Sequence, residues 1–473
     1  MTVSPNDSHN RDDGPANQLG PLDRFLTPFR DFAAKKPSGA VLLLAAAVLA
    51  LLWANSPWAS TYVAWLETPA VLGVGSLTID KPLILWINDG LMAVFFFVVG
   101  LEIKREVIAG ELTSLKKAAF PLAGAVGGVV VPALIYVALT SGSPAQSGWG
   151  VPMATDIAFA LGILALLGDR VPLGLKVFLT ALAIVDDIVA IGVIGIFYTD
   201  SVALGALGIG AAVLGLSVLA NRLGARHPLV YFILGFVVWF AFLKSGLHAT
   251  LAAVLMAFTI PATTRLNVRA LASRIGVAAR NLQGSVAASV AKPQPSPPQP
   301  AMPAPSSFLT HDQHHVIDGV SRDMLGATPP LQRIEHALLP FVTFFVLPVF
   351  ALANAGVALG GDVPMDWGAA LAVALGLLIG KPVGIVGAAW LAVKFKLAEL
   401  PPNVTWPQVL GVGFIAGVGF TMSLFIGSLA FSDIALTESV KVGVLCGSAV
   451  AGVIGTLLLR RALATHTSAA GDA

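Results

Sequence analysis

The sequence predicts an all-α integral membrane protein with about 12 transmembrane helices. Hydrophobic residues make up 56% of the chain and charged residues only 11%, whereas soluble globular chains carry roughly a quarter charged residues. The apolar residues gather in runs that approach the ~20 residues a helix needs to cross a bilayer. A few ionisable residues stand inside these runs, where a charge is costly and usually marks an ion path or a paired site.

The expected spans follow one another with interruptions at glycine and proline. They run approximately over residues 39–54, 83–101, 118–139, 151–167, 173–198, 202–220, 229–243, 247–260, 337–355, 369–393, 409–430 and 440–459. Lys and Arg concentrate in one alternate set of connections, including Arg170, Arg222, Arg265 and Arg460, and are rare in the other. Because cytoplasmic loops are enriched in basic residues, both termini are expected in the cytoplasm.

Five segments are expected along the chain. Residues 1–37 form a cytoplasmic tail in which Leu22, Phe25, Leu26, Phe29 and Phe32 recur at the spacing of an interfacial amphipathic helix. Residues 38–264 and 329–461 form the two parts of the transmembrane domain, and residues 462–473 form a cytoplasmic tail. Residues 265–328 are expected to be a long, mostly disordered loop, because Lys292–Pro305 is rich in Pro, Gln and Ser. Its His311, His314 and His315 could hold a metal or sense pH, but solvated polar residues in a flexible loop are the preferred explanation, because clustered histidines without a fold are weak evidence.

Other functions are disfavoured by composition. The net charge of +2 gives no basis for binding nucleic acid, and the single cysteine, Cys446, cannot form a disulfide within the chain.

Two adjacent carboxylates, Asp186 and Asp187, stand at the midpoint of the span over residues 173–198. Two carboxylates there repel each other, so they must hold either a proton or a cation. Successive helical residues point ~100° apart, which allows the two side chains to face different partners. A purely structural pair to a cation on a neighbouring helix is the alternative, although one carboxylate would be enough for that.

Lys381 lies at the midpoint of the span over residues 369–393, at the same expected depth as the two aspartates. An ion pair with one of them would offset part of the cost of burying it. A purely structural cation and a Schiff-base lysine are the alternatives.

Two interrupted helices are expected, one in each half of the chain. Gly150 and Pro152 precede Thr155 and Asp156, and a second Gly-rich run covers residues 411–423. Irregular backbone at membrane depth is tolerated only where it lines a cavity or is buried in protein, and paired interruptions point to a transporter site. Asp156 and Lys381 have the right signs to neutralise the facing helix ends. Close packing of small residues is the alternative explanation for the Gly-rich run.

Several long motifs resemble the NhaA family of sodium/proton antiporters. These motifs lie at residues 86–97, 100–106, 154–162, 186–187, 243–251, 352–356, 380–384 and 417–423. The similarity runs in order from about Asp23 to Arg461, excluding the long loop. This sequence departs from the family pattern at Leu339, where a second histidine is expected. The loop after Arg265 is also longer than the family pattern has it.

The resemblance implies a fold and a set of roles. The fold would contain inverted-topology repeats, with two discontinuous helices crossing at the bilayer midplane. Asp187 would bind the transported Na⁺, Asp186 would exchange protons with Lys381 as its salt-bridge partner, and Thr155 and Asp156 would lie at the crossing. The positions linked to pH regulation are Glu102, Arg105, Glu106, His248, Glu335 and His336; from sequence alone, those near the helix ends are also ordinary interface charges.

The leading hypothesis is a secondary transporter, not an enzyme, that moves Na⁺ and also Li⁺ outward against protons. It needs no cofactor, its surroundings are membrane lipid, and a homodimer is left open. A sodium-coupled symporter would need a more polar cavity, and a channel would need a filter built by several subunits. An intramembrane protease would need catalytic aspartates on separate helices or a metal motif, which the adjacent pair at Asp186 and Asp187 does not provide.

Overall fold

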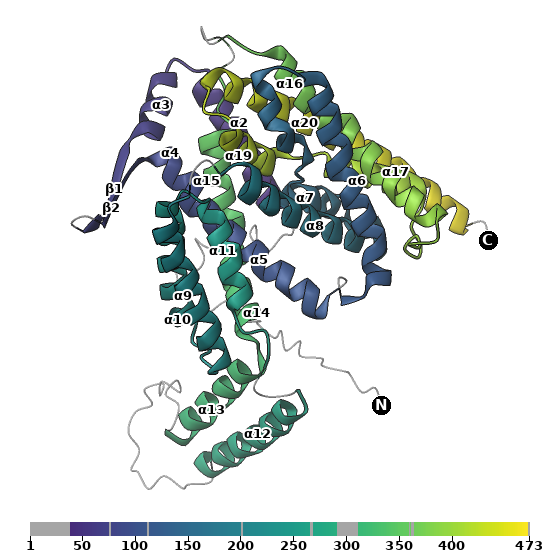
Figure 1. Ribbon diagram of the computed structural model, residues 1–473. Coiled ribbons are helices and arrows are strands. Elements are labelled where there is room, and N and C mark those ends of the chain that lie inside the picture. The colour runs from purple at the N-terminus through teal and green to yellow at the C-terminus, as the bar shows by residue number, and fades with distance from the viewer. Residues whose placement is uncertain are drawn as a thin grey trace, which may run out of the picture.

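The computed structural model describes residues 38–74, 77–110, 113–199, 202–264, 268–290, 311–358, 360 and 364–471. The amphipathic helix expected around residues 22–32 therefore lies outside the described residues. What is described is a bundle of helices with one small β-hairpin (Figure 1).

The helices differ widely in length. They are α2 Ser38–Ala54, α3 Ala59–Glu67, α4 Leu83–Trp86, α5 Met92–Ala109, α6 Leu115–Thr140, α7 Ile157–Leu166, α8 Leu173–Phe197, α9 Leu204–Arg222, α10 Pro228–Ser245, α11 Ala249–Thr259, α12 Val268–Val290, α13 His311–Ala327, α14 Pro330–Phe341, α15 Leu347–Asn354, α16 Trp367–Leu375, α17 Lys381–Lys394, α18 Trp406–Ala416, α19 Phe420–Ala430 and α20 Ile434–Gly471. Three π-helical turns, η2 Ile87–Leu91, η6 Val342–Val346 and η7 Gly376–Gly380, continue neighbouring α-helices, and η4 Pro144–Met153 and η5 Gly168–Arg170 are 3₁₀ segments.

Within the described residues, 8 helices are long and apolar enough to cross a membrane, or up to 11 if each of three bent pairs is one span. Each of the stretches expected from the sequence overlaps one of these, apart from residues 247–260, where α11 has only 11 residues. Leu204 is 79% exposed and Phe232 72% exposed. Large apolar side chains standing on the outer surface of α9 and α10 are what a lipid-facing helix presents.

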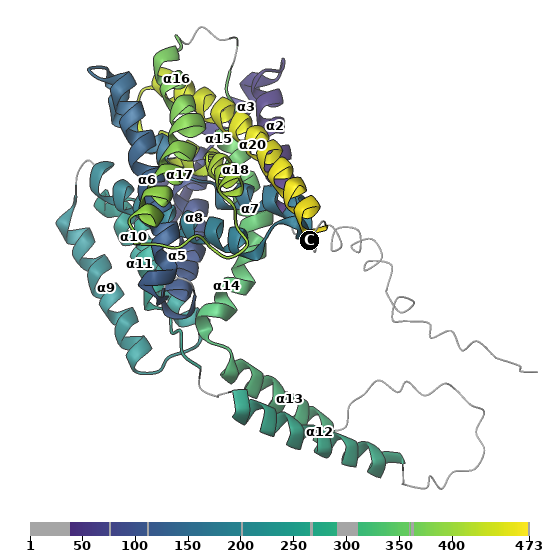
Figure 2. The ribbon, with the colours of Figure 1, turned by 90° about the vertical axis from the view of Figure 1, so that its right-hand side faces the viewer.

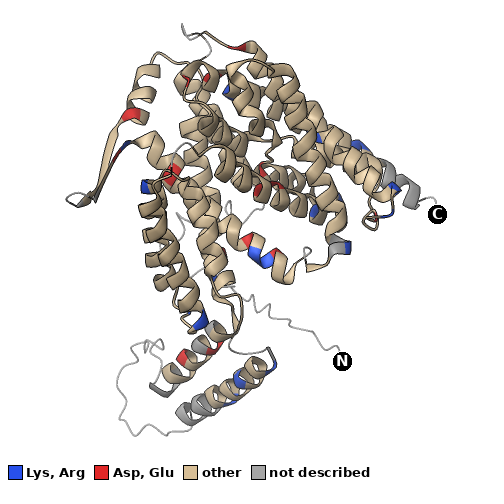
Figure 3. Cartoon of the chain, in the orientation of Figure 1, with Lys and Arg blue, Asp and Glu red and all other residues tan. Residues whose placement is uncertain are grey.

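Charged side chains are sparse over the body of the bundle and gather at its ends and on α12 and α13 (Figure 3). This distribution fits helices that are surrounded by hydrocarbon along their middle and by water at their ends.

One hairpin departs from the all-α expectation. Strands β1 Pro69–Val74 and β2 Leu77–Pro82 pair antiparallel with Pro69 opposite Pro82. The segment is too short to span a membrane and contains β-branched residues such as Val71 and Ile79, which favour a strand. The Trp86 Nε1 donates a hydrogen bond of 2.9 Å to the Ala70 carbonyl, which fixes the hairpin to the start of the next span.

The loop over residues 265–328 is not mostly disordered, because it contains α12 and α13, which pack against each other. In α12, Leu271, Ile275, Ala278 and Leu282 recur at helical spacing and are all half-buried, whereas the residues between them are largely exposed. Arg274 Nη1 also forms an ion pair of 2.8 Å with Asp323. This hairpin was not expected from the sequence, because an amphipathic stripe in an otherwise polar segment does not resemble a membrane span, yet it is sufficient for a two-helix hairpin.

The last helix extends into the segment expected as a cytoplasmic tail, residues 462–473. Helix α20 continues without a break to Gly471. The residues that follow Arg461 include Ala462, Leu463 and Ala464, which are strong helix formers, so nothing in the sequence ends the helix there.

Removing the α12–α13 hairpin should leave cation exchange nearly intact. The Leu331 backbone N donates to the Pro261 carbonyl at 3.1 Å, so the chain returns to where it left the bundle. A short Gly/Ser linker can therefore replace residues 268–327 without stretching the bundle. The measurement is exchange activity in everted vesicles across a pH series. A shifted pH profile would instead assign regulation to the hairpin, and loss of membrane insertion would contradict the expectation outright.

Helices α6 and α17 approach each other unusually closely. A Cβ atom added at Gly127 would lie 2.0 Å from the Gly384 carbonyl oxygen, and one added at Gly384 would lie 2.1 Å from the Gly127 carbonyl oxygen. Small residues on both helices therefore allow backbone contact, as is common between membrane helices. The same contact fixes the beginning of α17, where Lys381 is located.

Candidate ion-binding site

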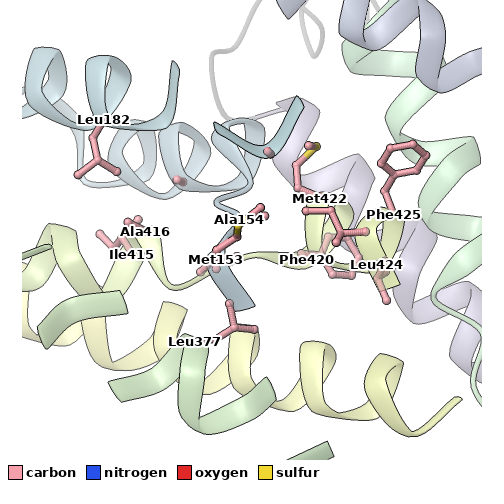
Figure 4. Packing of buried hydrophobic residues seen from close by; sticks show 14 of the residues in the cluster. Met153, Ala154, Leu182, Leu377, Ile415, Ala416, Phe420, Met422, Leu424 and Phe425 are labelled. Carbon is pink, nitrogen blue, oxygen red and sulfur yellow. The ribbon is translucent and has the colours of Figure 1, made fainter. Parts of the chain in front are cut away.

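Two interrupted helices meet in the centre of the bundle. Segments η4 and α7 are bent by 41° where residues 154–156 leave the helix, and α18 and α19 are bent by 44° after Ala416. At the first interruption Pro152 has no backbone donor. Figure 4 shows Met153 and Ala154 of the first interruption close to Ile415, Ala416 and Phe420 of the second.

Each interruption supplies hydrogen-bond partners for the other. The Asp156 backbone N donates to the Val418 carbonyl at 2.8 Å, and the Thr155 Oγ1 lies 2.9 Å from the Ala416 carbonyl. Backbone groups that a continuous helix would satisfy internally are therefore satisfied across the contact, which removes the main cost of irregular backbone away from water.

Asp156 is 1% exposed and its carboxylate is fully engaged. Oδ1 accepts a hydrogen bond of 2.9 Å from the Phe159 backbone N and so caps the start of α7. Oδ2 accepts from both the hydroxyl and the backbone N of Thr421, at 2.5 Å and 3.1 Å. Thr421 lies within the Gly-rich run over residues 411–423, and the sequence assigns it no role; only its place in the fold, far along the chain from Asp156, reveals the contact.

Asp186 is 2% exposed and forms an ion pair with Lys381, which is completely buried. Lys381 Nζ also donates to the Thr155 Oγ1 at 2.9 Å, and that hydroxyl lies 2.6 Å from Asp186 Oδ2. Lys381 of α17 and Thr155 of the first interruption thus both contact one carboxylate oxygen of Asp186 on α8. The second oxygen, Asp186 Oδ1, is buried without a hydrogen-bond partner in the described part of the chain.

Asp187 differs from its neighbour. It is also 2% exposed, but among the described residues its carboxylate has no hydrogen bond and no ion pair. Among the described residues, Lys381 is the lysine in contact with the pair, and it is held by Asp186 and Thr155. A buried carboxylate without a partner is unstable as a lone anion, and it becomes stable by taking up either a proton or a cation.

The residues considered for pH regulation fall into two places. Arg105 contacts three carboxylates, at 3.7 Å from Glu102, 3.2 Å from Glu106 and 3.0 Å from Glu335. The Arg105 Nε and the Glu335 Oε2 remain buried without hydrogen-bond partners in the described part of the chain. This cluster therefore joins α5 to α14, which are distant in sequence.

The two histidines stand apart from that ion-pair cluster. His248 Nε2 lies 2.6 Å from the Tyr198 carbonyl, at the ends of α8 and α11. His336 is exposed on α14, next to Glu335 in the sequence.

The His-rich stretch at the start of α13 gives no metal centre among the described side chains. His314, His315 and Asp318 are exposed, and the side chains of His311 and Asp312 lie outside the description. No group of three or more His, Cys, Asp and Glu side chains that could hold a metal ion occurs in the described ranges.

A buried amide pair went unnoticed in the sequence. Asn354 Nδ2 donates to Asn88 Oδ1 at 2.9 Å, and Asn88 Nδ2 donates to Asn354 Oδ1 at 3.3 Å. These reciprocal hydrogen bonds join η2 to the end of α15. Their only sequence signal was the presence of asparagine inside two apolar runs, which does not identify the partner.

Comparison with known proteins gives a consistent result over almost the whole chain. The family model described as Na⁺/H⁺ antiporter 1 matches residues 30–459. The Na(+)/H(+) antiporter NhaA of Oleidesulfovibrio alaskensis is 49% identical over 450 residues, covering 93% of this chain and 95% of the relative. The Na(+)/H(+) antiporter NhaA of Koribacter versatilis is 46% identical over 458 residues, covering 96% of both chains. The chain therefore belongs to the Na⁺/H⁺ antiporter 1 family.

Proposed function

We propose that this protein is a secondary transporter that extrudes Na⁺, and also Li⁺, in exchange for protons. The observation that carries the proposal is the contrast between the two adjacent aspartates. Asp186 is neutralised by Lys381, whereas Asp187 is equally buried and has no partner in the described part of the chain. Membership of a sodium/proton antiporter family and the names of the relatives support the same function.

Asp187 is the residue proposed to hold the cation. Carboxylate oxygens are hard ligands suited to a cation that has left water, and the oxygen of Asp186 that lacks a partner could complete the site. The transported ion is the cargo of the site and not a resident metal. No covalent step is involved, so the protein acts as a transporter without a cofactor.

Coupling follows from competition for the same carboxylates. When protons occupy them, the site has no net attraction for Na⁺; when Na⁺ arrives, the protons must leave. Lys381 gives Asp186 an alternative partner, so that this carboxylate can lose its proton without becoming a lone buried charge. Alternating exposure of one site to the two sides of the membrane then exchanges the two ions.

The finer architecture is also part of the proposal. Twelve spans result if each bent pair is one span and the short apolar helix α11 is counted as well. The two interrupted pairs, one in each half of the chain, support inverted repeats with the crossing at the bilayer midplane. The distribution of basic residues along the sequence supports an inner-membrane location with both termini in the cytoplasm.

A regulatory role is proposed for the Arg105 cluster. One guanidinium shared among Glu102, Glu106 and Glu335 leaves an excess of carboxylates, and protonation of Glu335 would weaken the link between α5 and α14. His248 and His336 are included in this proposal because the resemblance links their positions to pH regulation. A homodimer is compatible with this scheme but is not needed by it.

The direct test is proton movement in everted membrane vesicles. After respiration establishes a pH gradient, addition of Na⁺ or Li⁺ should collapse it, as reported by dequenching of a pH-sensitive dye, and K⁺ should have a much smaller effect. Vesicles lacking the protein are the control. Absence of dequenching with every cation would exclude the antiporter.

A further inference from the structure

A cavity separate from the ion site opens where α20 passes α7. Its volume is about 630 Å³, and it is lined by Leu166, Leu167, Arg170, Arg460, Leu463 and Ala464. Figure 2 shows the last turns of α20 beside α7, and the two helices are in contact. None of the residues proposed to carry cation exchange contributes to this lining.

The cavity is cationic. Arg170 belongs to η5, the turn between α7 and α8, and Arg460 comes from a helix near the other end of the chain. Among the side chains that the structure describes, neither guanidinium has a carboxylate partner and no acidic residue lines the cavity. Two arginines lining one cavity provide planar sets of donors that match the oxygens of a phosphate group.

The rest of the lining is apolar. Leu463 is 7% exposed and joins the main hydrophobic core, whereas Leu166 is 60% exposed. A small soluble phosphate would gain nothing from an exposed leucine beside its binding groups. A phospholipid would gain from both parts, because its phosphate would contact the arginines while its acyl chains covered the leucine.

We propose that this cavity binds the phosphate group of an anionic phospholipid. Both arginines belong to the set of basic residues that the proposed topology places on the cytoplasmic side, where the membrane surface is negatively charged. That sidedness rests on the proposed topology; the binding site itself rests on the cavity.

The bound lipid would connect two parts of the transporter. Arg170 lies in the turn between α7, which begins at Asp156, and α8, which carries Asp186 and Asp187. Arg460 is on α20, which also packs against α18. A single phosphate contacted by both arginines would hold this turn against α20 and stabilise the folded protein.

The experiment measures lipid binding to the purified full-length protein in detergent, not transport. Phosphatidylglycerol should raise the melting temperature of the wild type, whereas phosphatidylcholine and sn-glycerol 3-phosphate should not. The double substitution Arg170→Gln, Arg460→Gln should lose most of this shift. In native mass spectrometry it should bind phosphatidylglycerol about tenfold or more weakly, because two charge-assisted contacts are lost.

The matched control removes two arginines elsewhere. Arg269→Gln, Arg280→Gln changes exposed residues of α12 and should keep the full phosphatidylglycerol shift. Arg170→Lys, Arg460→Lys keeps the charge without the planar donor set, so it should bind the lipid with intermediate affinity. An equal shift in the wild type and the Gln variant would overturn the site. A shift produced by glycerol phosphate alone would overturn the lipid as ligand, and neither result would affect the proposed cation exchange.

Discussion

Asp187→Asn should abolish Na⁺-dependent proton movement while the protein still inserts into the membrane. An amide nearly matches the carboxylate in shape, so the packing of α8 around this buried position should survive. It cannot take up or release a proton, however, and it carries no charge to attract a cation. Loss of a charged contact of about 1.5–3 kcal/mol would weaken cation binding by roughly 10- to 100-fold. Loss of the proton site would then remove what exchange remained.

The measurement is dye dequenching in everted vesicles that contain equal amounts of wild-type and variant protein. Asp318→Asn is the matched control, because it makes the same chemical change at an exposed position on α13 and should leave exchange unchanged. Appreciable Na⁺-dependent flux from the Asp187 variant would contradict the assignment. The cation would then have to be sought at Asp186, whose oxygen Oδ1 also lacks a partner within the described ranges.

The sequence could predict the spans and the main site residues because membrane burial makes their signals strong. A charge within an apolar run is so costly that Asp186, Asp187 and Lys381 were recognisable without any structure. Proline and glycine likewise marked the helix interrupted near Asp156, since their backbone properties are local. These inferences depend on one residue and its immediate neighbours.

Contacts between distant segments could not be predicted in the same way. The hydrogen bond from the Thr421 hydroxyl to Asp156 joins residues 265 positions apart, and the hydrogen bond from Asn354 to Asn88 joins residues 266 positions apart. Nothing local distinguishes these polar residues from others within the spans, because their partners are chosen by helix packing. The hairpin of α12 and α13 was missed for a different reason: each helix has a low overall hydrophobicity, unlike a membrane span, and its apolar stripe is covered by the other helix.

Each single substitution in the pair between Asp186 and Lys381 should destabilise the protein, and the two losses of stability should add up to more than the loss in the double variant. Lys381→Ala leaves Asp186 as a buried carboxylate held only by the Thr155 hydroxyl, and Asp186→Asn leaves Lys381 as a buried cation. Removing one partner of a buried pair typically costs about 3–5 kcal/mol. Each single variant should therefore melt at a lower temperature in detergent than the wild type.

The double variant tests whether the two effects share a cause. With both Asp186→Asn and Lys381→Ala in place, no lone charge remains, so the loss of stability should be clearly smaller than the sum of the two single losses. The control cycle uses Lys441 and Glu438, a pair at 2.8 Å whose side chains are 16% and 19% exposed. Partly hydrated pairs contribute roughly 0–1 kcal/mol, so Lys441→Ala and Glu438→Gln should have small and nearly additive effects.

Strict additivity at Asp186 and Lys381 would mean that the two charges do not stabilise each other. Lys381 would then act by neutralising the helix ends at the interruptions, and its partner should be sought among the carbonyl groups between Ala416 and Gly419.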